Sequence, residues 1–552
     1  MRSKSIQSCR EAIYHDLQQC RSRTFKLFAD IDYDTFCRQA HADFSPVGWH
    51  LGHIAYTEDL WLLQRCAGLK PVFPEYHQLF AADILPKKQR VFLPALPEVE
   101  LYLDAVRKKV LDYLEVAPIA QQERLWRFII QHESQHCETV AFVLQMLRKE
   151  EGSSAADFVT DVTDVTDRRH QEEGSSATDF VADVADVTDR RNLEEQGLIT
   201  DSQFPIPNFQ FPISNSPSPM PNAHPSTSRA GKMPNAHPST SRAGKMPNAQ
   251  CPPFDFASGQ DAPCPMPHAH PSTSRAGKMP HAPCPPFDFA SGQDAPCPIP
   301  HAPSPIPDST IAIAGGEFYM GSDAAEALDN ERSRHLCYLE TYAIDRYPVT
   351  CGQYRDFMAS GGYQNRDWWS AEGWEWQKVH LVDRPLYWSE NPAFNNHPVC
   401  GVSWYEAQAY CNFAGKRLPS EAEWEKAASW DGTNQIYRTY PWGEAPPNAS
   451  LCNHGNNLAN TSPVDAFPKG ASAAGCGDML GNVWEWTASI FDAYPGFESY
   501  PYRGYSEVYF DGEHRVLKGG SWATFPQALR SSFRNWYYPG VRQIIAGFRC
   551  AK

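Results

Sequence analysis

The chain has 552 residues, too long for one ordinary domain, and its length suggests two to four. Its 49 Lys and Arg against 65 Asp and Glu give a net charge of −16, which argues against nucleic acid or an anionic membrane as the main partner. No apolar run approaches the roughly 18 residues that a membrane-spanning helix needs. Residues 1–17 carry no apolar stretch of the secretory type, so we expect a cytoplasmic protein with mostly reduced cysteines.

Helical periodicity dominates residues 1–150, where few Gly or Pro residues interrupt long segments with one apolar side. The pattern predicts four helices, at about 5–30, 47–61 (after the start signal Ser45-Pro46), 97–115 and 119–149. Four helices of this length, with one long connection at 66–96, predict a helix bundle.

Residues 151–307 have a different composition, rich in Pro, Ser and Gly and containing repeats. The segment MPNAHPSTSRAGK at 220–232 recurs at 233–245, and residues 201–307 hold 26 of the chain's 47 prolines. Such a segment has too few apolar side chains to offset the entropy of ordering its backbone. We therefore predict a low-complexity, disordered insertion between two folded domains.

Residues 308–552 have the short apolar runs, many Trp and irregularly spaced Gly of a loop-rich α+β domain. The pattern predicts two helices there, at about 404–414 and 420–428, among short strands. The predicted domains are therefore 1–150, 151–307 and 308–552.

The strongest chemical signal is QHESQHCE at 131–138, inside the fourth predicted helix. Residues i and i+4 share one helical face, so His132 and His136 can direct both imidazoles at one point. His50 and His53 of the second helix are candidates for a third ligand, one reaching the bundle interior and the other lying near its rim. Three histidines leave coordination positions open and suit either iron(II) with oxygen chemistry or zinc with an activated water.

Two qualifications apply to this motif. A histidine pair at this spacing also occurs by chance in structural helices, and a third histidine on another helix is what favours a metal. Glu138 lies two residues after His136, about 200° around the helix, so we expect it to support a ligand by hydrogen bonding and not to bind the metal directly.

Two groups of motifs resemble known families. SPVGWHLGHIAYTEDLWLL with HESQHCE resembles the DinB-like metal-binding helix bundle. GGEFYMGSD, RLPSEAEWEKAA, GNVWEWTAS, LKGGSWA and AGFRC resemble the formylglycine-generating-enzyme (sulfatase-modifying factor) fold, which is related to C-type lectins. In this order the two resemble the ergothioneine-pathway sulfoxide synthases, iron enzymes that join a thiol to hercynine. The similarity leaves 151–307 unmatched.

The resemblance implies roles for particular residues. His53, His132 and His136 fall at the positions of the family's three iron(II) ligands, whereas His50 does not. Gln135 and Tyr505 fall where the family holds the imidazole of hercynine.

Three further positions follow from the same resemblance. Asn535 and Trp536 fall where the family contacts the betaine end of hercynine, and an indole face suits a trimethylammonium group, which has no N–H to donate. Tyr502 falls at the tyrosine credited with proton delivery to oxygen, and a phenol with an ordinary pKa near 10 stays protonated at neutral pH.

The implied activity is that of an oxidoreductase that uses iron(II) and dioxygen to form a C–S bond between hercynine and a thiol, giving a sulfoxide. The branch that uses γ-glutamylcysteine has an Asp directly after the Asn-Trp pair and an Arg four residues beyond it. This chain has Tyr537 and Val541 instead, so charged groups that could hold a glutamyl arm are missing. This favours free cysteine, but Arg542 or Arg90 could substitute, so γ-glutamylcysteine stays open.

The sequence favours other functions less. A formylglycine-generating enzyme needs a reactive cysteine pair near the GGSW segment, and residues 519–535 contain no cysteine. An ovothiol-type synthase joins cysteine to histidine itself, but that branch usually carries a methyltransferase domain, and no Gly-rich nucleotide loop occurs here. A non-enzymatic, lectin-like binding module on a helical scaffold is the remaining alternative, as is a zinc-dependent thiol transferase.

Overall fold

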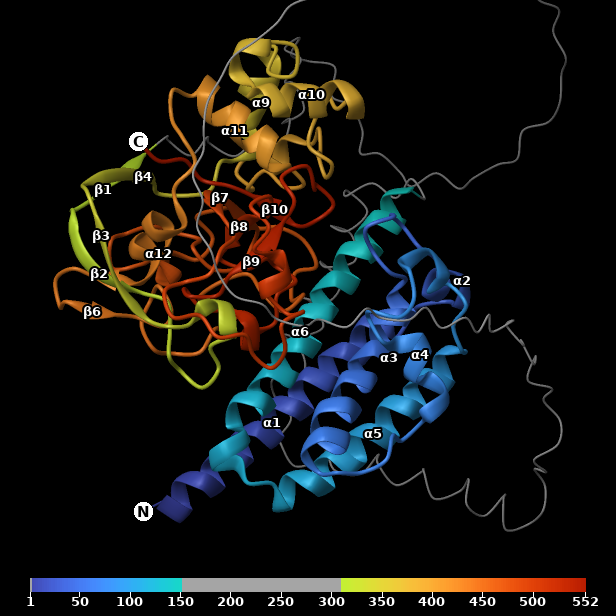
Figure 1. The fold of residues 1–552 in the computed structure, drawn as a ribbon. Helices are drawn as coiled ribbons and strands as arrows, with labels where there is room; N and C mark the ends of the chain where they lie inside the picture. Colours follow the sequence, from blue (N-terminus) through green and yellow to red (C-terminus); the bar gives the residue numbers. More distant parts are fainter. Residues whose placement is uncertain (1, 151–308) are drawn as a thin grey trace, which may run out of the picture. The chain divides into compact units, whose positions relative to one another are not determined.

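The computed structural model describes residues 2–150 and 309–552 (Figure 1). The predicted disordered insertion at 151–307 lies outside the described residues. No helix in the described part of the chain is long and apolar enough to cross a membrane.

Four long helices form the amino-terminal part. They are α1 (Arg2–Phe28), α3 (Val47–Glu58), α5 (Leu96–Val116) and α6 (Ile119–Glu150). These helices confirm the predicted bundle. Shorter helical segments occupy the connections: α2 (Tyr33–Cys37), Pro74–Tyr76, α4 (His77–Phe80) and Lys87–Gln89. The second predicted helix changes character at its end, because α3 continues as a wider π-helical stretch over Asp59–Cys66.

Four charged side chains, one from each long helix, meet inside this bundle. Arg21 of α1 donates to Glu58 of α3 and to Glu133 of α6, both at 2.8 Å. Arg107 of α5 also contacts both carboxylates, at 3.0 Å from Nε to Glu58 Oε2 and 2.7 Å from Nη2 to Glu133 Oε2. All four side chains are at most 6% exposed. We call Arg21, Glu58, Arg107 and Glu133 the buried quartet. Because each carboxylate contacts both guanidinium groups, the quartet sets the register of all four helices.

The carboxy-terminal part is an α+β domain built on small sheets. Its strands are β1 (Thr310–Ile313), β2 (Gly316–Met320), β3 (His335–Leu339), β4 (Tyr342–Asp345), β5 (Trp430–Asp431), β6 (Ile436–Tyr437), β7 (Trp484–Ile490), β8 (Arg515–Lys518), β9 (Asn535–Tyr537) and β10 (Ala546–Gly547). The largest sheet has the order β10-β7-β8-β9, with only the β10–β7 pair parallel. The chain thus has the predicted fold class.

The helices of this domain are α9 (Cys351–Ala359), α10 (Ala371–His380), α11 (Trp404–Phe413) and α12 (Glu421–Ser429). The last two confirm the predicted pair. Sequence analysis missed α9 and α10, although both begin with a capping residue, Thr350 and Ser370, whose side chain accepts a backbone N–H. Both helices are short: α9 buries Cys351, Tyr354 and Phe357 at helical spacing over only nine residues, and α10 buries only Gly373.

One side of α6 is bonded to the carboxy-terminal domain. Gln131 Oε1 accepts a hydrogen bond from Arg530 at 2.7 Å, and Glu138 Oε1 accepts one from the Trp484 indole at 2.8 Å. Between them, Gln135 Oε1 accepts from the Tyr505 hydroxyl at 3.0 Å. Spacings of four and three residues place these side chains on one helical face.

Replacing one guanidinium of the buried quartet tests its contribution to stability. Arg107→Met leaves two buried carboxylates with a single cation, so we expect the free energy of unfolding to fall by about 3–5 kcal/mol. Lys378→Met, in the exposed Lys378–Glu375 pair, is the matched control and should cost less than about 1 kcal/mol. Urea unfolding followed by circular dichroism measures both; equal effects would contradict the assignment.

The same variant has a defined pH dependence. Burial alone would raise the pKa of Glu133, but Arg21 and Arg107 lower it to about 2. The stabilisation from this carboxylate is therefore present above its ordinary pKa of about 4.3 and disappears as pH falls through 2. The stability difference between the parent chain and Arg107→Met should shrink over that interval.

Candidate metal centre

Three imidazoles converge between α3 and α6. One ring nitrogen from each of His53, His132 and His136 lies within 4.8 Å of the other two. The Nε2 atoms of His132 and His136 are 3.1 Å apart, as expected for residues i and i+4 on one helix. Within residues 2–150 and 309–552 this is the one group of three or more histidine, cysteine or acidic side chains that is compact enough to hold a metal. These are the three residues that the sequence pointed to.

The hydrogen bonds of these rings favour one orientation for metal binding. His53 Nδ1 lies 2.6 Å from the carbonyl oxygen of Phe80, so it carries the proton and Nε2, 3.5 Å from the Thr57 hydroxyl, carries the lone pair. His136 Nδ1 lies 2.8 Å from His50 Nδ1; in the tautomer in which His136 donates this bond, its Nε2 carries the lone pair for the centre. A hydrogen bond donated by the ring nitrogen that does not bind the metal is the usual way in which proteins orient metal-binding imidazoles.

Gly52 makes the contact with Phe80 possible. A Cβ atom at this position would lie 2.1 Å from the Phe80 ring, so only glycine lets the connecting segment pack this closely against α3. The close approach delivers the Phe80 carbonyl to His53. On the other side of His53, Trp49 stacks on the imidazole with ring centroids 4.6 Å apart.

The prediction that one histidine of α3 lies near the rim of the bundle was wrong. His50 does not lie near the rim; it is only 6% exposed, close to the 7% of His53. Its side chain reaches His136 and acts as the hydrogen-bond partner of that ring, outside the group of three.

Burial keeps all these imidazoles neutral. Removal from water lowers the pKa of His53 to about 4, and that of His50, which also faces His53, to about 3. Desolvation and the neighbouring histidines lower the pKa of His132 and His136 well below their ordinary values. Neutral imidazoles offer lone pairs at physiological pH, which is what a borderline divalent transition metal requires. The donor set therefore fits such an ion.

The predicted role of Glu138 was wrong. Its carboxylate turns away from the histidines and accepts hydrogen bonds from Trp484, Ser521 and Thr524 of the carboxy-terminal domain. The physical reason is its position on α6: a residue about 200° from His136 faces the other side of the helix. Burial raises the pKa of Glu138, and its three hydrogen-bond donors oppose that effect.

Aromatic side chains from the carboxy-terminal domain form a wall next to the histidines. Tyr505 donates to Gln135 and packs edge-on against Phe128, with ring centroids 5.0 Å apart. Phe128 in turn lies 6.0 Å from His132, measured between ring centroids. Trp536 stands edge to face with Tyr505 at 6.0 Å and stacks on Phe491 at 4.2 Å.

The remaining two predicted site residues lie in the same region. Tyr502 is 40% exposed and stacks on Trp61 of the bundle with ring centroids 5.6 Å apart; its ring is 6.5 Å from that of Tyr505. Asn535 begins β9, and its side-chain oxygen accepts the backbone N–H of Trp536 at 2.9 Å. The structure thus brings Tyr502, Tyr505 and Trp536 into one aromatic group.

Sequence analysis missed several groups that shape the site. Trp49 and Phe128 each lie four residues before a histidine of the cluster, so helical periodicity was an available signal. Arg90 was named only as a possible substitute for a lost charge, yet it stacks on Trp49 with its guanidinium 4.0 Å from the ring centroid. The Phe80 carbonyl had no signal, because any residue carries one.

Comparisons with known proteins match both described parts of the chain. Residues 16–151 match the DinB superfamily, and residues 299–552 match the sulfatase-modifying factor enzyme 1-like domain. Among solved structures, PvdO from Pseudomonas aeruginosa is 25% identical and covers 44% of this chain and 93% of its own. Its TM-score of 0.32 is too low to carry an argument about the site.

Named relatives extend over both parts. The hercynine oxygenase of Mycobacterium tuberculosis is 44% identical over 250 residues, which cover 42% of this chain and 58% of that protein. The hercynine oxygenase of Mycolicibacterium smegmatis is 30% identical over 563 aligned residues, which cover 98% of this chain and 99% of that protein. On the strength of this full-length similarity, the chain belongs to the hercynine oxygenase family.

Proposed function

We propose that this chain is an iron(II)-dependent sulfoxide synthase that joins hercynine to a thiol, with dioxygen as the oxidant. The observation that carries the proposal is the convergence of three neutral imidazoles beside Gln135 and Tyr505, in a chain that aligns with a hercynine oxygenase over 98% of its length. The reaction balances as one C–H bond, one S–H bond and O₂ giving a C–S bond, a sulfoxide oxygen and water.

Iron(II), held by His53, His132 and His136, would supply open coordination positions and a route for electrons from the two organic reactants to oxygen. The protein side chains hold the two organic reactants next to each other, which removes much of the entropic barrier to their coupling.

Gln135 and Tyr505 are assigned to the imidazole of hercynine. The Gln135 amide presents both a donor and an acceptor, so it can bond either ring nitrogen. Burial raises the pKa of Tyr505 well above its ordinary value, so its hydroxyl stays protonated and keeps donating. The bond between the two side chains fixes the amide before the substrate arrives.

Trp536 and Asn535 are assigned to the betaine end. One face of the Trp536 indole is covered by Phe491, with the two rings only 7° from parallel. Tyr505 and Tyr509 also pack against this indole, at 6.0 and 5.6 Å between ring centroids, and a trimethylammonium group next to such an aromatic group gains from cation–π contact. The Asn535 amide nitrogen is the matching donor for the carboxylate, because its oxygen already accepts from Trp536.

Tyr502 is assigned to proton delivery from its hydroxyl oxygen. Burial and neighbouring acidic groups raise its pKa to about 12, so the phenol is protonated throughout the physiological range. Stacking on Trp61 holds the ring in place. Tyr502 is thus a neutral proton donor next to Tyr505 and Trp536, the aromatic residues assigned to hercynine.

The decisive experiment starts the reaction with oxygen. The purified chain is loaded with iron(II) without air, mixed with hercynine and a thiol, and then exposed to oxygen while mass spectrometry follows the products. We expect a hercynine–thiol sulfoxide that forms only with both iron and oxygen. Product from histidine but not hercynine would favour the ovothiol-type alternative, and no coupling with either acceptor would reject the proposal.

Metal content distinguishes the three ligands from their neighbour. His53→Ala, His132→Ala and His136→Ala should each reduce bound iron and turnover to background. His50→Gln removes only the hydrogen bond to His136, so we expect iron affinity to fall about 10- to 100-fold. His380→Gln, on the exposed end of α10, is the control and should bind iron normally. Elemental analysis after dialysis measures each variant; an unchanged His132→Ala would refute the assignment.

Two tyrosine variants separate proton delivery from binding. Tyr502→Phe should lower kcat at least 10²-fold, the usual range for a lost proton donor, with little change in the KM of hercynine. Tyr505→Phe removes the hydrogen bond to Gln135, so its main effect should be a higher KM for hercynine. Steady-state oxygen consumption gives both parameters. The opposite pattern would exchange the two roles.

For the thiol donor we expect a preference for free cysteine, because the two cations that could hold a glutamyl arm have other partners. Arg542 contacts Glu406 at 3.1 Å, and Arg90 donates to the Leu85 carbonyl at 2.9 Å and to Ser45 Oγ at 3.1 Å. With both cations engaged, we expect kcat/KM for cysteine to exceed that for γ-glutamylcysteine by at least about tenfold. The same assay with each thiol checks this ratio. The double substitution Tyr537→Asp/Val541→Arg should move the ratio towards γ-glutamylcysteine.

A further inference from the structure

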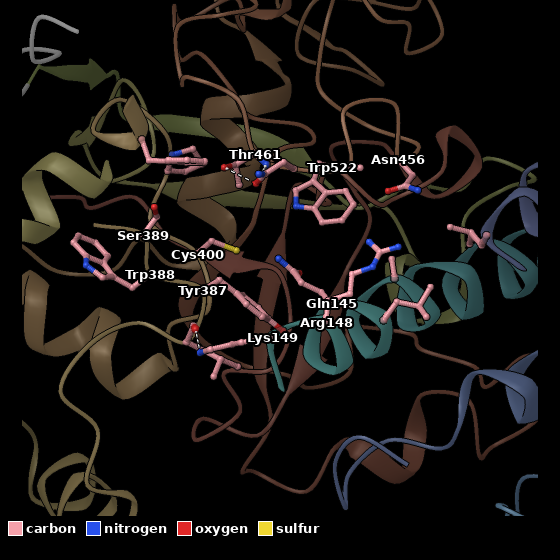
Figure 2. Close-up of a pocket in the computed structure, with 18 of the residues that line it drawn as sticks. Gln145, Arg148, Lys149, Tyr387, Trp388, Ser389, Cys400, Asn456, Thr461 and Trp522 are labelled. Carbon is pink, nitrogen blue, oxygen red and sulfur yellow. Dashed lines mark hydrogen bonds between the residues drawn. The ribbon is translucent and has the colours of Figure 1, made fainter. Parts of the chain in front are cut away.

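A cavity of about 460 Å³ lies between the bundle and the carboxy-terminal domain, apart from the histidine cluster (Figure 2). The ends of α1 and α6 line one side of it, and the opposite side includes Tyr387, Cys400 and Trp522. None of the predicted site residues contributes to its wall. Its first α6 residue, Ala141, follows His136 by five residues, roughly 8 Å along the helix axis. Its volume is within the range of small-molecule sites, about 300–1,000 Å³.

The interior of this cavity is apolar and aromatic. Leu144, Phe394, Cys400 and Trp522 line it and are each at most 9% exposed. Burial raises the pKa of the Cys400 thiol far above neutral pH, so this sulfur is an uncharged part of the wall. Such a surface suits an aromatic or branched hydrocarbon body.

Three polar atoms of the wall have no hydrogen-bond partner within the described residues; one is the indole nitrogen of Trp388. The other two are the indole nitrogen of Trp522 and the amide oxygen of Gln145, and all three atoms are buried. Figure 2 shows Gln145, Cys400 and Trp522 around the same space. Buried polar groups are normally paired, so two donors and one acceptor remain for an occupant once these side chains adjust.

The rim of the cavity carries an excess of positive charge. Lys26 and Lys149 line it and are exposed, and the Lys149 ammonium donates to the neutral Leu386 carbonyl, which leaves its charge uncompensated. The acidic residues of the lining are Asp30 and Glu390. Glu390 is already paired with two further cations, at 2.8 Å to Arg355 and 3.4 Å to Arg384. Glu390 is therefore neutralised, and the two lysines outweigh the single charge of Asp30, so an anion would be attracted.

We propose that this cavity is a second binding site, which takes a small amphipathic anion with an aromatic body. The aromatic body packs against Cys400 and Trp522, and the acidic group lies at the rim near Lys26 and Lys149. An occupant would contact both domains, because each supplies part of the wall. Binding in this cavity is independent of the activity proposed above, since no residue of the histidine cluster lines it.

The probe for this site is 8-anilinonaphthalene-1-sulfonate, an aromatic anion whose fluorescence rises in apolar surroundings. Titration of the full chain should show one saturable site per chain. Ala141→Trp fills the cavity from α6 and should raise the dissociation constant at least tenfold, with circular dichroism checking that the variant is folded. Unchanged binding in a folded Ala141→Trp would overturn the proposal, because the probe would then bind elsewhere.

A charge variant keeps the test valid if Ala141→Trp does not fold. Lys26→Gln at the rim should weaken binding at least threefold, whereas Lys108→Gln, an exposed lysine on α5, should leave it unchanged. The uncharged analogue N-phenyl-1-naphthylamine should bind more weakly than the anion. Equal binding of the two probes, or equal effects of the two lysine variants, would reject the charge argument and with it the anionic ligand.

Discussion

The buried quartet is the interaction on which the rest of the structure depends. Two guanidinium groups and two carboxylates have no net charge together, but each alone would be a costly charge inside the bundle. Their geometry is satisfied only when all four helices are in register. Glu133 is the residue after His132, and Glu58 follows His53 by five positions, so the same register that pairs the charges brings the imidazoles together.

Helix α6 links the bundle to the carboxy-terminal domain because two of its faces make different contacts. His132 and His136 point to α3, whereas Gln131, Gln135 and Glu138 bond to the carboxy-terminal domain. Gln135 belongs to the second set and is also the residue that we propose holds the imidazole of hercynine. A site assembled in this way needs both domains, and its aromatic wall comes from loops that a helix bundle does not have.

The sequence predicted the long helices and the histidines well for a clear reason. Apolar residues at helical spacing specify α1, α3, α5 and α6, and the i, i+4 pair in α6 needs no tertiary knowledge. Prediction from the sequence failed where the position of a side chain depends on packing between segments. Nothing local places His50 inside the bundle, directs Glu138 to Trp484, or brings the Phe80 carbonyl to His53. Tyr502, Tyr505, Asn535 and Trp536 lie in loops and a short strand, so only resemblance could single them out.

The two faces of α6 also restrict how this helix can change over evolution. Inserting or deleting a single residue between His132 and Glu138 would rotate everything beyond it by about 100° and shift it by about 1.5 Å along the axis. The ligands and the interdomain bonds could not then both be kept. Substitutions can accumulate along this helix one at a time, but its length between those two residues is fixed.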